Sequence, residues 1–273
     1  MSDTPRNRVR PAAVAGTFYP RDPHTLAATV DGLLADAAVR HSRGARGSLR
    51  AVIVPHAGYV YSGPIAAAAY SELRSCVARF RRVVVIGPAH RVPVRGLAVS
   101  SADVFATPLG AVTVDIAARH KALQVSGVVV DDAAHALEHS VEVQLPFLQR
   151  VAPGLPVLPL VVGTAPSNVV RALLDALWDD GTLLVVSTDL SHYLEYDQAR
   201  AVDANTADHV VAERSEAIGD RDACGAYALR PLLEAGRARN LRVDQLDLRS
   251  SGDTAGGHDQ VVGYGAFAVE AAA

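Results

Sequence analysis

The feature that most constrains the fold of this 273-residue chain is a set of three short runs rich in β-branched residues. A histidine follows each run within a few positions. The runs cover residues 51–55, 83–87 and 183–187, and the histidines after them are His56, His90 and His192. Short apolar runs bounded by Gly, Pro or Ser are typical of buried parallel strands. Because open α/β sheets bind ligands beyond the carboxyl ends of such strands, this placement predicts one site that gathers three imidazoles.

The segments between these runs predict an α/β fold with a mostly parallel sheet and helices on both faces. We expect a loop over 56–63, a hairpin around 105–110 between segments 96–100 and 111–115, and further strands at 157–162 and 261–269. Helices are expected from Asp22-Pro23 onward and over about 64–77, 140–151, 167–178, 197–217 and 224–236. Residues 1–10 form a polar leader, and 11–273 are expected to form a single domain because no later stretch is typical of a linker.

Composition excludes several classes of partner. The net charge of −3, without a basic stripe, argues against nucleic-acid binding. No run of roughly 18 apolar residues predicts a membrane span, and the N-terminus lacks the apolar core of a signal peptide. Two cysteines far apart do not make a disulfide framework, which favours a reducing, cytoplasmic setting.

His56 and His90 are candidate metal ligands. Each follows its strand through a proline-containing turn, and neutral imidazole is the commonest metal ligand in proteins. Two such positions can converge on one ion. The alternative is that each histidine is a hydrogen-bonded structural residue, which is the more frequent role of a lone histidine after a strand.

Asp189 and His192 share one turn, so the carboxylate can orient the imidazole as a general base; alternatively, Asp189 or Ser191 caps a following helix. Cys224 precedes a helical pattern, where the helix dipole favours the thiolate. The other role for a cysteine, a small buried apolar side chain, suits Cys76 better.

Residues 135–139 match the H-x-x-E-H pattern of one zinc peptidase class. That motif requires a long continuous helix, whereas Ser140 is typical of a helix start, so a peptidase is not favoured. We expect His139 and Glu142 to face the crevice as groups that contact substrate. The chain has no P-loop, no dinucleotide loop and no nucleophile elbow, which disfavours ATP, NAD and α/β-hydrolase functions.

Several motifs in a fixed order resemble one known family. They are Pro55-His-Ala-Gly-Tyr-Val-Tyr-Ser-Gly63, Gly87-Pro-Ala-His90, Glu138-His-Ser-Val-Glu-Val-Gln-Leu-Pro146, Ser187-Thr-Asp-Leu-Ser-His192 and Cys224-Gly225, with Ala15-Gly-Thr-Phe-Tyr-Pro20 before them and Val261-Val-Gly-Tyr-Gly265 after. In this the chain resembles the Memo family, also called AmmeMemoRadiSam system protein B, over nearly its whole length. The bacterial family name implies a functional link to a radical-SAM protein and a companion.

The resemblance implies a fold like that of the class III extradiol dioxygenases, which are non-haem iron enzymes. It implies that His56, His90 and Cys224 hold one iron(II) or copper ion per chain, with a redox role. Extradiol enzymes use two histidines and a carboxylate. Because a cysteine takes the third position here, ring cleavage of catechols is not inherited from the fold.

By the same resemblance, Asp189, His192 and Tyr61 are neighbouring site residues. Two hypotheses follow. The first is a metal-dependent oxidoreductase acting on a small organic substrate or an oxygen species, in which His192, oriented by Asp189, is the acid/base. In this first hypothesis, the pocket is shaped by Tyr59, Tyr61 and His139. The alternative is a non-catalytic metal carrier, or a module that binds a peptide or partner, on the same fold. The sequence leaves the oligomeric state open.

Overall fold

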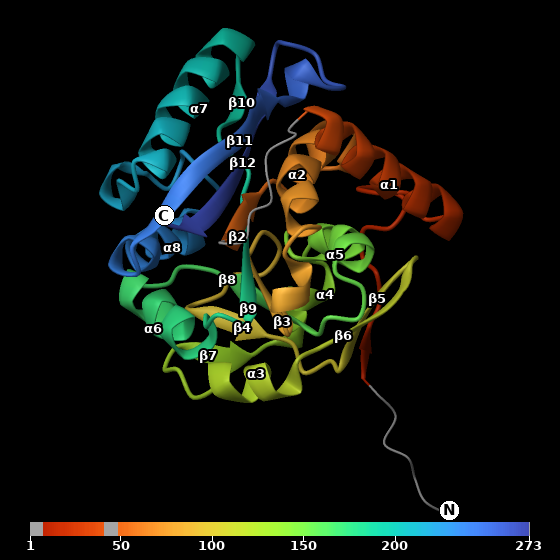
Figure 1. Ribbon diagram of the computed structural model, residues 1–273, viewed down its shortest axis with the longest axis vertical. Coiled ribbons are helices and arrows are strands. Elements are labelled where there is room, and N and C mark those ends of the chain that lie inside the picture. The colour runs from red at the N-terminus through yellow and green to blue at the C-terminus, as the bar shows by residue number, and fades with distance from the viewer. Residues whose placement is uncertain (1–7, 41–48, 273) are drawn as a thin grey trace, which may run out of the picture.

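A computed structural model describes residues 8–40 and 49–272 of the chain (Figure 1). Most of the expected polar leader, residues 1–7, lies outside the described residues. Its end does not behave as a leader, because Val9–Arg10 forms strand β1 of a small sheet. No helix within the described ranges is long and apolar enough to cross a membrane.

Within the described residues the main sheet has nine strands and is mixed. Along the sheet the order is β10 (His192–Leu194), β12 (Val261–Ala271), β2 (Leu49–Val54), β9 (Thr182–Ser187), β3 (Arg82–Pro88), β8 (Val157–Val162), β4 (Leu97–Val99) and β7 (Val128–Val130), with β11 (Leu241–Ser250) also paired to β12. Strands β2, β9, β3 and β8 are parallel, as expected, and are buried along nearly their whole length.

The expected α/β fold is confirmed, with a parallel centre to the sheet, but its margins are antiparallel. Strand β12 runs antiparallel to β2, β10 and β11, and β4 runs antiparallel to β8. On the side of β12, the antiparallel margin arises from the long β11–β12 pair near the C-terminus. Strand β11 alternates polar and apolar residues on a partly exposed edge, and the sequence interpretation had assigned no strand there.

A second sheet of three strands, β1–β5–β6, contains the hairpin. Its strands are β5 (Val104–Thr107) and β6 (Gly110–Thr113), so the expected hairpin was misplaced at its first strand. The segment at 96–100 instead supplies β4 of the main sheet.

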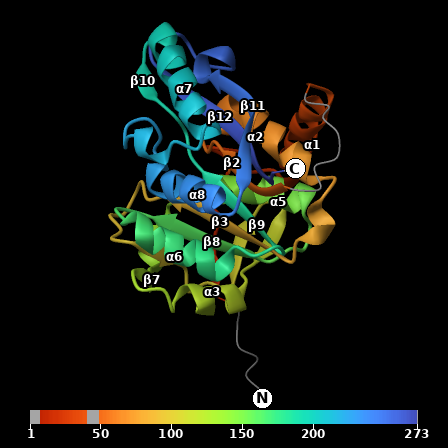
Figure 2. The ribbon, with the colours of Figure 1, turned by 60° about the vertical axis from the view of Figure 1, so that its left-hand side comes forward.

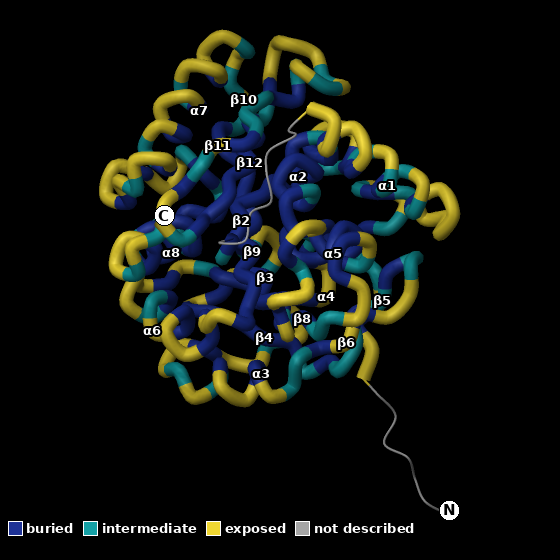
Figure 3. Tube along the Cα trace, in the orientation of Figure 1, coloured by how far each residue is buried: buried dark blue, intermediate teal, exposed yellow. Residues whose placement is uncertain are grey.

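Helices cover the main sheet on two sides (Figures 1 and 2). Helices α1 (Pro23–Arg40), α2 (Tyr59–Leu73) and α5 (Leu145–Val151) pack on one another, and α6 (Ser167–Leu177) packs on α8 (Ala226–Ala238) on the other side. The remaining helices are α3 (Ile116–Ala122), α4 (Asp132–Ala136) and α7 (Tyr196–Val211), with short 3-10 turns at Val77–Arg79, Glu142–Gln144, Ser215–Ala217 and Ser251–Asp253. The buried core follows the central strands (Figure 3).

Two helix starts differ from expectation. Helix α2 begins at Tyr59, so most of the expected loop 56–63 is helical and Pro64 lies inside the helix. The backbone N–H groups of Tyr61 and Ser62 bond to the carbonyl of Gly58, which starts the helix without a side-chain cap. The expected helix 140–151 is split into the 3-10 turn at 142–144 and α5.

Candidate metal centre

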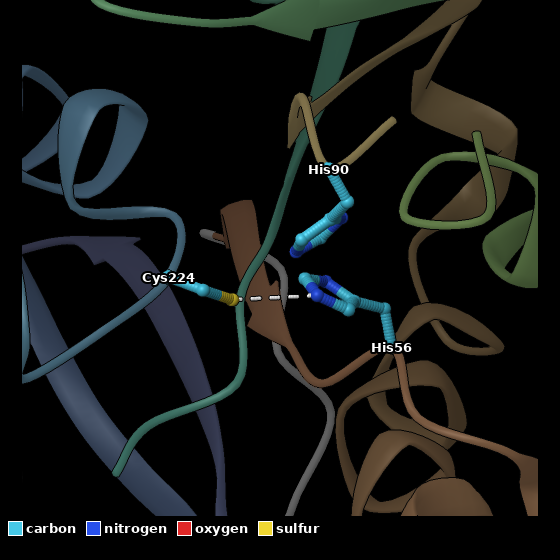
Figure 4. A group of neighbouring side chains, drawn as sticks. All are labelled: His56, His90 and Cys224. Carbon is cyan, nitrogen blue, oxygen red and sulfur yellow. Dashed lines mark hydrogen bonds between the residues drawn. The ribbon is translucent and has the colours of Figure 1, made fainter. Parts of the chain in front are cut away.

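The carboxyl ends of three parallel strands meet at one edge of the sheet and carry the candidate site. His56 lies two residues after β2 and His90 two residues after β3, while Cys224 lies two residues before α8. One ligand atom from each of these three residues lies within 4.8 Å of the others. Figure 4 shows the two imidazoles and the thiol pointing toward one another from three separate segments.

His56 is buried and neutral. Burial lowers the pKa of this imidazole well below its usual value, and the neighbouring His90, His139 and His192 lower it further. Its Nδ1 contacts the hydroxyl of Ser187 at 2.9 Å, while its Nε2 lies 3.3 Å from the sulfur of Cys224. A neutral ring with one nitrogen engaged by the protein is the form in which histidine binds metals.

His90 is exposed, but its ring is oriented by Glu138, a fully buried carboxylate that the sequence interpretation did not assign to the site. Glu138 accepts hydrogen bonds from the backbone N–H of His90 at 2.6 Å and from its Nδ1 at 2.9 Å. Burial raises the pKa of Glu138, but the hydrogen bonds from His90 and the backbone of Ser140 outweigh it and lower the pKa to about 2. The H-x-x-E-H pattern had pointed to this carboxylate, although for a different chemistry.

Glu138, His90 and His139 also place ligand atoms within 4.8 Å of one another. The oxygens of Glu138, however, already accept from His90 and from the backbone N–H groups of His139 and Ser140. A carboxylate that orients a ligating histidine in this way is a common support of metal sites. This cluster therefore serves the first site and is not a second one.

Cys224 differs from the expectation of a ready thiolate. Burial raises the pKa of its thiol to about 12, and the nearby Asp189 also raises it. The sulfur accepts a hydrogen bond from the backbone N–H of Asp189 at 3.3 Å. Cys224 stands outside the first turn of α8, where desolvation exceeds the effect of the helix dipole. Burial therefore favours the protonated thiol in this arrangement.

Asp189 does not orient His192, which corrects the sequence hypothesis. Its carboxylate accepts from the backbone N–H of His56 at 2.7 Å, and burial raises its pKa to about 7. The Nδ1 of His192 instead contacts the carbonyl of Leu190 at 2.8 Å. Because a carbonyl only accepts, this nitrogen carries the proton and Nε2 keeps a lone pair. The chain turns between the two side chains, so neighbours in sequence face different partners.

His139 lies against the two ligand histidines, whereas Tyr61 is exposed. The ring of His139 stacks on that of His90, with centroids 4.6 Å apart, and lies 5.4 Å from the ring of His56. Burial and then His90 lower the pKa of His139 to about 4. Tyr61 is exposed on the first turn of α2 and stays a predicted site residue.

Tyr59 and Glu142, expected to contact substrate, are used in the interior. The Tyr59 hydroxyl donates to the carbonyl of Val143 at 2.6 Å, and its ring packs on Phe147. Glu142 is fully buried and ion-paired with Arg10. Both side chains have their polar atoms engaged inside the protein, so their hydrogen bonds assign them structural roles.

Beside His192 the backbone is strained. Tyr193 has a φ of 58°, a left-handed conformation that a bulky residue rarely adopts, and its side chain is 70% exposed. It sits where the register of β10 and β12 shifts between His192 and Leu194. Such bulges re-aim side chains and often lie next to functional sites.

Sequence similarity relates the chain to one protein family. The family model described as "Memo-like protein" matches residues 10–268. A MEMO1 family protein of Aquifex aeolicus is 34% identical, covering 94% of this chain and 97% of its own. One of Aeropyrum pernix is 35% identical, covering 96% and 100%. A crystal structure of an uncharacterized protein from Escherichia coli K12 aligns with a TM-score of 0.46 at 15% identity, over 79% of this chain and 99% of that one.

Proposed function

This chain belongs to the Memo family, and we propose that it binds one iron or copper ion between His56, His90 and Cys224 and uses it in redox chemistry. A single observation carries the proposal. The outward Nδ1 atoms of both histidines are engaged by Ser187 and Glu138, while a thiol sulfur and a ring nitrogen face each other at 3.3 Å with ligand atoms of all three residues within 4.8 Å.

The donor set fits such an ion. Two imidazoles and one sulfur suit iron or copper, and the softness of a thiolate favours copper(I) or thiolate-bound iron. The backbone N–H of Asp189 already points at the sulfur, so it would stabilise the thiolate once the proton has left. A bound ion of this kind would supply one-electron chemistry and open positions for a small substrate.

We assign proton transfer in that chemistry to His192. The carbonyl of Leu190 holds the proton on its Nδ1, which leaves the Nε2 lone pair to accept a proton from a substrate. Burial lowers the pKa of His192, so the ring starts neutral and able to act as a base. In this scheme Asp189 holds the backbone of His56 in place and does not act on His192.

The test is the metal content of protein purified without oxygen and loaded with ferrous or cuprous ions in parallel. We expect close to one ion per chain in the wild type and in Cys76→Ser, whose sulfur is buried away from the site. Cys224→Ser and His56→Ala should lose the ion. At a hundred times the dissociation constant, the ion should raise the free energy of unfolding by about 2.7 kcal/mol, and Cys224→Ser should abolish this gain. No ion under either loading would overturn the proposal.

Catalysis is tested separately by oxygen consumption of the loaded protein with a reductant and candidate organic substrates. His192→Ala should keep its ion and lose turnover, because in the proposed scheme its imidazole takes no part in holding the ion. An unchanged rate in His192→Ala would remove this residue from the mechanism. A wild type that holds its ion and never turns over would leave a metal carrier as the function.

A further inference from the structure

We propose that Ser187 is a positioning residue that fixes the proton of His56 on Nδ1, so that the Nε2 lone pair is presented to the metal position. The proposal deepens, and depends on, the metal site proposed above. The proposal gives a function to a series of buried hydrogen bonds. This series runs from α2 through the 3-10 turn at 142–144 to the end of β9. Its members are Tyr70, Gln144, Ser187 and Ser140.

The argument begins with the single proton of the Ser187 hydroxyl. This hydroxyl lies 2.6 Å from the carbonyl oxygen of Ser140, which can only accept, so the proton points there. The two remaining contacts of the same oxygen, to Gln144 Nε2 at 2.9 Å and to His56 Nδ1 at 2.9 Å, must therefore be ones in which Ser187 accepts. It follows that Nδ1 of His56 is the donor and carries the ring proton.

Gln144 strengthens this assignment because its amide has one satisfactory orientation. Its Oε1 accepts from the hydroxyl of Tyr70 at 2.9 Å, and its Nε2 donates to the carbonyl of Pro55 at 2.9 Å as well as to Ser187. Turning the amide over would set its oxygen against the Pro55 carbonyl and leave two acceptors facing each other. Gln144 can therefore only donate to Ser187 and cannot take its proton.

Burial makes the arrangement selective. The side chains of Ser187, Ser140, Gln144, Tyr70 and His56 are all at most 1% exposed. Water therefore does not compete for the Nδ1 proton, and leaving that donor unpaired would carry the full penalty of a buried unsatisfied group. On the other side of the ring, Nε2 lies 3.3 Å from the Cys224 sulfur and is free to ligate. These hydrogen bonds thus select one tautomer of His56 before any ion binds.

The direct test reads the tautomer of His56 in protein treated with a chelator. Long-range ¹H–¹⁵N correlation spectra distinguish a ring protonated on Nδ1 from one protonated on Nε2, and the signals are assigned with His56→Gln. We expect the wild type to carry the proton on Nδ1. A wild-type ring protonated on Nε2 would overturn the proposal without any variant.

Ser187→Ala tests the cause. In this variant Nδ1 loses its hydroxyl acceptor, and the Nε2–H donor of Gln144, which bonded to the same oxygen, faces the vacated position. The backbone of Ser187, which also interacts with the ring, is unchanged, so the variant isolates the hydroxyl. The proton should then shift toward the metal-facing nitrogen. Ferrous or cuprous ion should then bind about 10- to 100-fold more weakly, the usual effect of losing the outer partner of a ligating histidine. Unchanged Nδ1 protonation in a folded Ser187→Ala protein would show that Ser187 does not select the tautomer.

Two controls separate positioning from general disruption. Ser62→Ala removes another buried hydroxyl, which donates to the carbonyl of Ala57 at 2.9 Å, and should leave the tautomer and the affinity unchanged. Tyr70→Phe removes only the far end of the series of hydrogen bonds and should keep the proton on Nδ1. If the spectra are as expected but no ion binds to the wild type, the proposed function fails while the positioning of His56 stands.

Discussion

Two polar clusters both use residues of the short segment 138–144, but they differ in whether their polar atoms are fully engaged. The closed cluster joins Glu142 to Arg10, to the Tyr19 hydroxyl and to the backbone N–H groups of Ala13 and Val14. The open cluster consists of His56, His90 and Cys224 with their supports. In the closed cluster both carboxylate oxygens are fully engaged, whereas in the open cluster the protein binds the outer ring nitrogens and leaves inner ligand atoms facing one another.

The difference separates a structural use of buried polarity from a functional one. A buried carboxylate with four donors around it holds the N-terminal segment against the domain, and no position is left for a ligand. In the open cluster the Nε2 of His56 and the Cys224 sulfur face each other, which leaves these atoms available to the proposed ion. The two clusters are therefore distinguished by whether all their polar atoms have hydrogen-bond partners. Residue type does not distinguish them as clearly, since residues of both clusters were candidate site residues in the sequence.

The largest expected effect comes from breaking the closed cluster. Arg10→Met would leave the Glu142 carboxylate buried beside uncharged donors only, and would also free the carbonyls of His135 and Glu138, which accept from the guanidinium. Removing one partner of a buried ion pair typically costs about 3–5 kcal/mol. We expect a loss of this size in the free energy of unfolding, measured by urea denaturation.

The matched control is Arg8→Met, which removes a guanidinium that is mostly exposed and lies 4.0 Å from Asp103. Exposed pairs contribute about 0–1 kcal/mol, so this variant should be near wild type. Arg10→Met protein that remains folded should still bind its metal ion, because the open cluster does not use Arg10. Equal losses in the two variants would contradict the distinction between the clusters.

A smaller effect is expected from protonating His135, which lies beside the closed cluster. Burial lowers the pKa of this imidazole to about 4, and Arg10 lowers it further. Between pH values of about 6.5 and 4 the unfolded chain binds a proton at His135 that the folded protein does not. The free energy of unfolding should therefore fall as the pH is lowered through this window, by up to about 1.4 kcal/mol per pH unit from this residue.

The measurement is the free energy of unfolding in urea at a series of pH values. His135→Gln should make the decline below pH 6.5 shallower, because an amide can still donate to the Ala98 carbonyl, as the ring Nε2 does at 3.0 Å, without titrating. The exposed His120→Gln serves as the control and should follow the wild-type curve. Identical slopes in His135→Gln and the wild type would mean that protonation of His135 is not a source of acid instability.

Local patterns in the sequence were sufficient for the parallel core and for the edge on which the site lies. Apolar runs of strand length predicted β2, β3 and β9, and position alone then placed His56 and His90 at one edge. The long β11–β12 pair was missed in part because β11 is partly exposed and its polar residues are not typical of a core strand.

What the sequence could not give was the partner of each polar group. Glu142 pairs with Arg10, which is 132 positions away, and Asp189 bonds to His56, which is 133 positions away. A pattern of neighbours favours the nearby His192 as the partner of Asp189, but the backbone after β9 turns the two apart. The charge state of Cys224 likewise depends on burial by distant segments, which outweighs the nearby helix start.

The smallest expected effect concerns backbone strain, because the residue in a left-handed conformation differs between the two clusters. Beside the closed cluster the left-handed position is occupied by glycine, Gly16 with a φ of 90°, whereas beside His192 it is occupied by Tyr193 with a φ of 58°. A side chain in this conformation costs roughly 1–2 kcal/mol, and glycine loses about 0.5–1 kcal/mol in backbone entropy. Tyr193→Gly should thus raise the free energy of unfolding by up to about 1 kcal/mol, since the exposed ring contributes little packing. Gly16→Ala should lower it by a similar amount. If thermal and urea denaturation show that Tyr193→Gly instead destabilises the protein, the bulge is held by contacts of the tyrosine ring and is not a strained support of His192.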